Sequence, residues 1–416
     1  MSRPTYAIVG GGVAGASAAE ALRGEGFDGR IELIGAERDL PYERPPLSKT
    51  LLRGETGRDS AALRAPEFYA RNSIELRLGE AVSRLDIPNR RIELAGGGRI
   101  AYDKVLVATG TSPRRLGIPG GDLAGIHYLR TLDDAALLAS ELQRRPALLV
   151  IGSGFIGCEV AASARQVGCE VTVVGPTLPM ERALGAEVGA IYAGYHRARG
   201  VTLKSGHTID AFLGTNALEA ARLSDGSTVA CDAVVVGIGV TPSVSWLGDE
   251  LGSSAGVETD EFCRTNVDGV FAAGDVAFSW RPRLGRRIRL EHFDNAESQG
   301  AAAGRAMHGT MRAYDPIPFF WSDQYDFSLQ YYGHASKWDR VVLRGPAADG
   351  SFIAFYLEHD RIEAICAVNR SRESSAIKRL IGRSDLPPQE LAIDGPIKNL
   401  AAFIGRTGEI HEDLRV

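Results

Sequence analysis

The chain has 416 residues, 49 of them glycine, and a formal net charge of −5 at pH 7. The length predicts two or three domains at about 150 residues per domain. A hydrophobic fraction of 44% and a charged fraction of 24% are ordinary for a globular protein, which excludes a disordered, collagen-like or coiled-coil chain. The negative net charge leaves no overall basic field, so we expect no nucleic-acid partner.

The N-terminal residues predict a strand, a glycine turn, a helix and a second strand. The strand is 6–9, the turn is Gly10–Gly15 with the pattern GxGxxG, the helix is 14–22 and the second strand is 30–34. A helix that begins at such a turn directs its backbone N–H groups and its positive dipole end at a pyrophosphate, which the glycines allow to approach. An acidic residue after the second strand then binds a ribose, and Glu37 is the candidate.

The same unit recurs in the middle of the chain, with a strand at 147–151, the turn Gly152–Gly157, a helix at 158–167 and a strand at 170–174. Two copies in the same context indicate two dinucleotide sites far more strongly than one copy would. Gly175 stands where the second ribose-binding acid is expected, and no arginine follows before Arg182 to bind the 2′-phosphate of NADPH. The sequence therefore favours NADH and leaves NADPH possible.

Further apolar runs end in small residues at 104–110, 233–239 and 269–275. Continuous apolar runs are typical of parallel strands, because both faces of a parallel sheet are covered. From about Phe319 the pattern changes to shorter strands at 328–332, 340–343, 352–357 and 362–368, with helices at 374–381 and in the C-terminal tail. The predicted fold class is α/β, with two Rossmann-like dinucleotide-binding domains and a smaller C-terminal α+β domain with an antiparallel sheet.

The surroundings of the protein are also predicted. An apolar run begins at Tyr6, so we expect no targeting segment. No stretch reaches the ~18 apolar residues of a membrane span, so we expect no membrane partner. The five cysteines are scattered without a CxxC pair, and the eight histidines show no ligand spacing. This indicates a reducing, cytoplasmic location and no metal site.

Two dinucleotide sites suggest two cofactors, FAD and NAD(P)H, with hydride passing from the nicotinamide to the flavin. No cysteine precedes Cys158, so no thiol relay is expected beside the flavin, and electrons leave directly for an external acceptor. The segment 280–289 carries five arginines and no acid around a Leu-Gly tip. It predicts a hairpin that is either a basic docking face or an ordinary solvated one.

Several motifs resemble those of the FAD-dependent ferredoxin reductases of bacterial oxygenase and P450 systems, the family of putidaredoxin reductase, rhodocoxin reductase and the biphenyl dioxygenase ferredoxin reductase. The motifs are LPYERPPLSK at 40–49, ATG at 108–110, GSGFIGCE at 152–159, Gly-Asp at 274–275 and WSDQ at 321–324. The resemblance implies a glutathione-reductase-like fold. It divides the chain into an FAD-binding domain at 1–115 and 244–318, an NAD(P)-binding domain at 116–243 and a C-terminal domain at 319–416.

The resemblance also implies an activity and a partner. NADH would reduce non-covalent FAD, and FAD would reduce an acidic [2Fe-2S] ferredoxin that feeds an oxygenase or a cytochrome P450. The ferredoxin would dock on a basic face that includes Arg286 and Arg287, with Trp321 as a further candidate contact. Two alternatives stay open: a stand-alone NAD(P)H oxidoreductase acting on a small acceptor such as a quinone, and a redox-controlled binding protein similar to apoptosis-inducing factor.

Site residues follow from the same resemblance. Lys49 would lie at the flavin N5, paired with Glu159, where a cation favours the reduced anionic flavin and the carboxylate offsets the burial of that charge. Glu37 would bind the adenosine ribose, Val82 the adenine, and Glu291 would lie near the nicotinamide. The other residues implied at FAD are Gly10, Gly12, Ala14, Gly15, Arg44, Ala108, Thr109, Gly110, Arg130, Gly274, Asp275, Phe293 and Trp321. Those implied at NADH are Gly152, Gly154, Phe155, Ile156, Gly157 and Gly239.

Overall fold

Two parallel sheets with matching strand orders carry the two glycine turns. In the computed structural model, which describes residues 3–393, the orders are β20-β7-β1-β2-β3 and β9-β16-β10-β11-β12. The strands of the first sheet are β1 (Thr5–Val9), β2 (Arg30–Gly35), β3 (Ile74–Leu78), β7 (Lys104–Val107) and β20 (Val270–Ala272). Those of the second are β9 (Ile126–Tyr128), β10 (Ala147–Ile151), β11 (Glu170–Gly175), β12 (Val201–Ser205) and β16 (Ala233–Val236). Each turn joins the middle strand to a helix, α1 (Val13–Gly24) or α4 (Phe155–Gln166), which confirms the predicted repeat.

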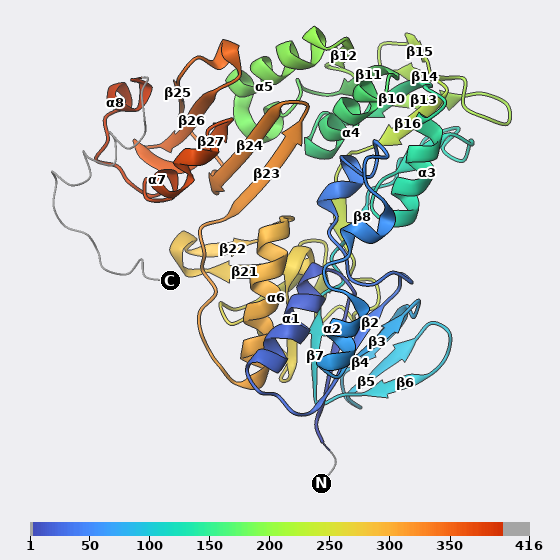
Figure 1. Ribbon diagram of the computed structural model, residues 1–416, viewed down its shortest axis with the longest axis vertical. Coiled ribbons are helices and arrows are strands. Elements are labelled where there is room, and N and C mark those ends of the chain that lie inside the picture. The colour runs from blue at the N-terminus through green and yellow to red at the C-terminus, as the bar shows by residue number, and fades with distance from the viewer. Residues whose placement is uncertain (1–2, 394–416) are drawn as a thin grey trace.

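Small residues let two helices of the first lobe cross closely. Helix α1 packs against α6 (Phe293–His308), as Figure 1 shows at the centre of the lower lobe. A Cβ added at Gly300 would lie 2.2 Å from the backbone oxygen of Ala14, and one at Gly304 would lie 2.4 Å from that of Ala18. The two glycines of α6 are thus required by helix packing, since any side chain there would meet the backbone of α1.

The chain crosses between the two lobes through β8 (Thr111–Pro113) and β17 (Val240–Pro242), which pair antiparallel. The crossings lie next to the boundaries predicted near 115 and 243, and the boundaries themselves stay a prediction. Three small sheets complete the lobes: β4 (Val82–Asp86), β5 (Arg91–Leu94) and β6 (Arg99–Ala101); β13 (Ile209–Leu213), β14 (Ala220–Leu223) and β15 (Thr228–Ala230); and β18 (Gly252–Ser253), β19 (Gly256–Thr259), β21 (Ala277–Arg281) and β22 (Arg286–Ile288). The remaining helices of these lobes are α2 (Pro66–Arg71), α3 (Leu132–Leu142) and α5 (Glu181–Ala198).

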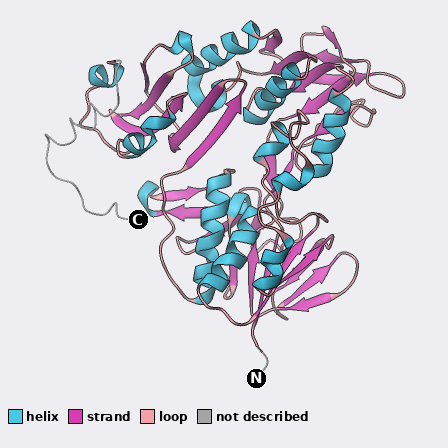
Figure 2. Cartoon of the chain, in the orientation of Figure 1, coloured by secondary structure: helices cyan, strands magenta, loops and turns pink. Residues whose placement is uncertain are grey.

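The C-terminal lobe is an antiparallel sheet of order β23-β24-β27-β26-β25, visible at the upper left in Figures 1 and 2. Its strands are β23 (Phe319–Gln324), β24 (Phe327–Gly333), β25 (Arg340–Arg344), β26 (Phe352–Glu358) and β27 (Arg361–Val368). The short helices α7 (Ser374–Lys378) and α8 (Pro388–Ala392) cover one face, and α5 of the second lobe covers the other. The helix expected over 374–381 ends earlier, because Gly382 has a φ of +86° and its N–H bonds to the sheet at Ile362. The expected helical tail beyond 393 lies outside the described residues.

No helix within residues 3–393 is both long and apolar enough to cross a membrane.

Candidate functional site

Four glycines of the two turns are required by the backbone itself. A Cβ at Gly10 would lie 2.1 Å from the Ala108 oxygen, and one at Gly15 would lie 2.1 Å from the Gly10 oxygen. The second unit repeats this geometry: the corresponding contacts are Gly152 to the Gly237 oxygen at 2.2 Å and Gly157 to the Gly152 oxygen at 2.0 Å. Any side chain at these positions would collide with main chain, so each turn closes tightly onto the neighbouring strand end.

The middle glycines, Gly12 and Gly154, differ from the others because a Cβ added there would meet nothing within 4 Å. Both are extended N-cap residues, and neither α1 nor α4 has a side-chain cap. The first backbone N–H groups of each helix therefore face open space, which is the arrangement that binds a pyrophosphate. Two nucleotide phosphates fit here, one at each turn.

Glu37, the candidate ribose ligand, lies in a polar cluster after β2. Its carboxylate accepts a hydrogen bond of 2.6 Å from the Tyr42 hydroxyl and forms an ion pair of 2.9 Å with Arg44. The Arg44 guanidinium also donates to the Tyr42 hydroxyl at 2.8 Å and to the backbone oxygen of Arg130. Burial raises the pKa of the Tyr42 phenol, so it stays a neutral donor. The Glu37 side chain keeps 32% of its surface exposed, which leaves its carboxylate accessible to a ligand.

Next to Arg44 lies Arg130, whose guanidinium forms an ion pair with Asp275 at 3.3 Å. The Thr111 hydroxyl donates to the same Asp275 oxygen at 3.4 Å. Arg130 Nε is buried without a hydrogen-bond partner among the described residues, and burial together with the Arg44 charge lowers the pKa of Arg130. Two adjacent guanidinium groups with an unmade hydrogen bond favour an anionic or polar ligand. These residues fit the phosphate and ribityl parts of FAD.

Lys49 and Glu159 lie together, as the family resemblance implies. Lys49 Nζ is 2.8 Å from Glu159 Oε2, and the two side chains are only 13% and 4% exposed. The Ser48 hydroxyl donates to Oε2 at 2.5 Å, and the Ser322 hydroxyl donates to Oε1 at 2.7 Å. Glu159 lies two residues after Gly157 on α4, while Lys49 follows the Pro45–Ser48 turn of the first lobe. The pair therefore joins the two lobes, one turn of helix beyond the second glycine turn.

The remaining predicted residues fall into four groups. Ala108, Thr109, Gly110 and Gly274 follow β7 and β20, and Ala14 packs under Gly274, its Cβ 2.9 Å from the position of an added one. Phe293 meets Trp321 edge-on at 5.7 Å between ring centroids, and Phe155 meets Phe320 at 4.9 Å. Ile156 is 47% exposed beside the second turn, and Gly239 follows β16. Val82 begins β4 in the small edge sheet, and Glu291 is held by Arg289 at 2.7 Å.

The strand pairing gives Gly175 a different counterpart from the one that the sequence suggests. Gly10 N donates to Ile34 O and Gly152 N donates to Val174 O, both at 2.8 Å. Gly175 therefore matches Gly35, and the counterpart of Glu37 is Thr177. A Cβ at Gly175 would lie 2.7 Å from Ser153 Oγ, so the glycine leaves room for the turn rather than replacing a ribose ligand.

Sequence reasoning missed the polar residues that hold the predicted ones in place. They are Tyr42, Ser48, Thr111, His196, Ser322 and Gln324. Tyr42 and Ser48 lie within the 40–49 motif, and Ser322 and Gln324 lie within WSDQ, so motif membership was the available signal. His196 carries no signal in the sequence.

Comparison with known proteins agrees with this geometry. The pyridine nucleotide-disulphide oxidoreductase family matches residues 4–300, and the reductase C-terminal family matches residues 319–401. The chain is 40% identical to the anthranilate 1,2-dioxygenase system ferredoxin–NAD(+) reductase component of Burkholderia cepacia, over 97% of this chain and 100% of the relative. It is 37% identical to rhodocoxin reductase of Rhodococcus erythropolis, over 98% of this chain and 96% of the relative.

Solved structures give the same result. The ferredoxin reductase for the CYP199A2 system from Rhodopseudomonas palustris superposes with a TM-score of 0.88 at 34% identity, covering 94% of this chain and 97% of the other. Putidaredoxin reductase in its covalent complex with putidaredoxin gives a TM-score of 0.86 at 31% identity, covering 94% and 98%. The chain therefore belongs to the pyridine nucleotide-disulphide oxidoreductase family and is an FAD-dependent oxidoreductase. Within that family it is a ferredoxin reductase of the kind that serves oxygenase systems, as its motifs predict.

Proposed function

We propose that the protein takes hydride from NADH onto FAD and delivers the electrons singly to a [2Fe-2S] ferredoxin, which feeds an oxygenase or a cytochrome P450. The observation that carries this proposal is the Lys49–Glu159 pair, with 2.8 Å between Nζ and Oε2, in which a lysine of the first lobe meets a glutamate at the start of α4 in the second. FAD, when bound, accepts two electrons together and releases them one at a time. The named relatives and the putidaredoxin reductase complex support the same partner class.

Different residues bind the two cofactors, according to the lobe in which they lie. The turn at Gly12 and the guanidinium groups of Arg44 and Arg130 bind FAD, and the turn at Gly154 binds NADH. Lys49 supplies a positive charge at the flavin, and Glu159 holds that charge in a buried place where a lone ammonium would be too costly. The predicted boundaries fit this division, with FAD bound by 1–115 and 244–318 and NADH by 116–243.

The cysteines support direct transfer to an external acceptor. All five are free and buried, and burial raises the pKa of Cys158 and raises that of Cys263 to about 12. A thiol with a raised pKa is a poor nucleophile, so none of these cysteines is suited to relay electrons. Five reduced thiols also support our placement of the protein in the cytoplasm.

A coupled assay tests whether the protein passes electrons to a ferredoxin. NADH should reduce cytochrome c rapidly only when a [2Fe-2S] ferredoxin is added, because the flavin has no fast route to the haem protein. Initial rates with and without ferredoxin measure this, with NADPH in parallel. A rate that does not depend on the ferredoxin would contradict the proposal. High quinone reduction without ferredoxin would instead support the stand-alone oxidoreductase.

The docking face is proposed on the hairpin of β21 and β22. Its five arginines are not equivalent: Arg281 is buried, while Arg287 pairs with Glu258 at 3.6 Å and Arg289 with Glu291 at 2.7 Å. Arg283 and Arg286 are exposed, and neither makes an ion pair within residues 3–393. These two charges, with the partly exposed Arg287, are the ones that an acidic partner would meet.

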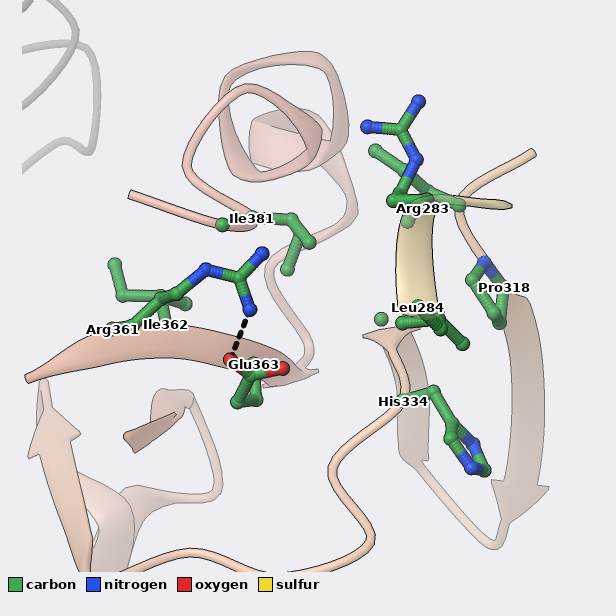
Figure 3. A pocket seen from close by; sticks show the side chains of 11 residues that line it. Arg283, Leu284, Pro318, His334, Arg361, Ile362, Glu363 and Ile381 are labelled. Carbon is green, nitrogen blue, oxygen red and sulfur yellow. Dashed lines mark hydrogen bonds and ion pairs between the residues drawn. The ribbon is translucent and has the colours of Figure 1, made fainter. Parts of the chain in front are cut away.

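The tip of the hairpin lies against the C-terminal lobe. Figure 3 shows Arg283 and Leu284 beside Pro318 and His334, with Ile362 and Ile381 across a small cavity of about 40 Å³. Burial, and then the charges of Arg286 and Arg281, lower the pKa of His334, so His334 is neutral and adds no charge of its own. A protein that docks here would contact both the first lobe and the C-terminal lobe.

Charge reversal tests this face. The double change Arg283→Glu and Arg286→Glu should raise the KM for ferredoxin about tenfold at low ionic strength and leave ferricyanide reduction by NADH unchanged, because rim charges act mainly on association. The difference should shrink as salt is added. Arg99→Glu with Arg144→Glu is the matched control, since both are exposed elsewhere, at 65% and 74%. Equal effects of the two pairs would remove the hairpin from the docking face.

A further inference from the structure

Behind Glu159, a line of buried hydrogen bonds extends away from Lys49. Ser322 Oγ lies 2.7 Å from Glu159 Oε1, Gln324 Nε2 lies 3.2 Å from Ser322 Oγ, and His196 Nε2 lies 2.9 Å from Gln324 Oε1. All of these side chains are at most 4% exposed. The line passes from α4 through β23 to α5, so it links the second lobe to the C-terminal lobe at the point where the first lobe contributes Lys49.

The direction of every hydrogen bond in this line is fixed by the carboxylate. An ionised Glu159, paired with Lys49, can only accept, so the Ser322 hydroxyl must donate its one proton to it. Ser322 Oγ can then only accept, which requires the amide NH₂ of Gln324 to face it. The Gln324 oxygen consequently faces His196, whose Nε2 must carry the proton.

His196 fits this donor role. Burial lowers the pKa of His196, so the ring is neutral and has one N–H. Its other nitrogen, Nδ1, is buried without a hydrogen-bond partner in the described part of the chain. An unpartnered buried acceptor costs free energy. The charged neighbour that faces this ring is Arg199, which also lowers the pKa.

We propose that His196, Gln324 and Ser322 are positioning residues that orient the Glu159 carboxylate toward Lys49. Their donors all point at the carboxylate, and aligned hydrogen bonds in a buried line strengthen one another. Ser322 occupies Oε1, so that Oε2 is left for Lys49 and Ser48. The effect on the flavin rests on the role proposed above for Lys49, whereas the direction of the hydrogen bonds does not.

The alternation of β23 gives the line a second consequence. Ser322 and Gln324 point inward on the same face, toward Glu159 and His196 respectively, so their neighbours on the strand point to the opposite face. Trp321 there packs on Phe293, with 5.7 Å between ring centroids. Ser322 therefore fixes the position of β23. Strand β23 in turn places Trp321 on the side of the first lobe where the flavin is proposed to bind.

Flavin reduction by NADH in the holoenzyme, followed by stopped flow, and the midpoint potential of the bound flavin test the proposal. Ser322→Ala should slow flavin reduction about tenfold, the loss expected for one hydrogen bond to a charged group, and shift the potential in the direction of Lys49→Ala. Gln324→Leu, which removes the hydrogen bond that orients Ser322, should act in the same direction. Ser322→Thr, which keeps the hydroxyl, should restore both. Gln330→Leu in the adjacent strand β24 is the control, since within residues 3–393 the Gln330 side chain bonds to Tyr332 and Ser374 and not to the line.

The double variant Ser322→Ala with Gln324→Leu should be no slower than the slower single variant, because both changes break one line. Effects that multiply would overturn the proposal.

Nitrogen NMR of ¹⁵N-histidine-labelled protein tests the direction of the bonds without any electron transfer. The His196 signals, assigned by their loss in His196→Phe, should show a proton on Nε2 and none on Nδ1. A proton on Nδ1 would overturn the proposed direction of the hydrogen bonds even in a fully active reductase. If the protein shows the Nε2 tautomer but fails the ferredoxin assay, the line of hydrogen bonds stands and only the proposed function is refuted.

Discussion

Gly12→Val is expected to give a folded protein that carries no flavin. The valine Cβ would meet nothing within 4 Å, and the backbone at Gly12 has a φ of −92°, which any residue adopts, so the fold has no reason to fail. The side chain would instead occupy the space in front of the α1 N-terminus, where the phosphates approach. Absorbance of the purified protein between about 350 and 500 nm, where flavins absorb, measures how much flavin is retained. Circular dichroism checks the fold.

Matched glycine variants separate the two turns. Gly154→Val should retain the yellow colour but resist bleaching by NADH, since the equivalent open space lies at α4. Gly15→Ala should fail to fold, because its Cβ would lie 2.1 Å from the Gly10 oxygen. A Gly12→Val protein that is purified with full flavin would refute the phosphate role of the first turn.

Lys49→Ala is expected to make the bound flavin harder to reduce. Removing a cation that contacts the anionic reduced form costs about 1.5 to 3 kcal/mol, which lowers the two-electron midpoint potential by about 30 to 60 mV. A spectroelectrochemical titration measures the shift. An unchanged potential would refute the placement of Lys49 at the flavin.

The same variant should also lose stability, because Glu159 would be left as an unpaired charge with 4% exposure. Breaking a buried pair in this way costs about 3 to 5 kcal/mol. Lys49→Ala combined with Glu159→Gln removes both charges and should recover most of the stability without recovering the potential. The double variant thus distinguishes an electrostatic role of Lys49 from a purely structural one, and thermal unfolding of the apoproteins gives the stability comparison.

The sequence was sufficient for the two dinucleotide units because their signal is local. GxGxxG has to follow a strand and open a helix, and the same tight contacts recur at Gly10 and Gly152. The WSDQ and LPYERPPLSK motifs lie far apart in sequence, and the structure brings Ser322 and Lys49 of the two motifs together at Glu159. The pairing of Lys49 with Glu159 came only from the resemblance, since nothing in their spacing brings them together.

The features that could not be predicted from the sequence depend on contacts between residues far apart in the chain. The line from Glu159 to His196 joins residues of three separate segments, and no periodicity relates them. The arginine-rich hairpin was predicted as a shape, but its charge balance depends on distant Glu258. Gly175 was misjudged for the same reason, because its counterpart is set by hydrogen bonds across the sheet rather than by residue count.

The pairing of β20 with β7 has a consequence for the order of synthesis. Val105 is in register with Val270, so the edge of the first sheet stays open while the whole second lobe is made. A contact between strands so far apart in sequence forms slowly, and domains fold as units from the N-terminus during translation. Asp275 and helix α6 come after β20 in the chain, so the pocket proposed for FAD can close only after the second lobe has left the ribosome. We therefore expect FAD to insert late in the maturation of this reductase.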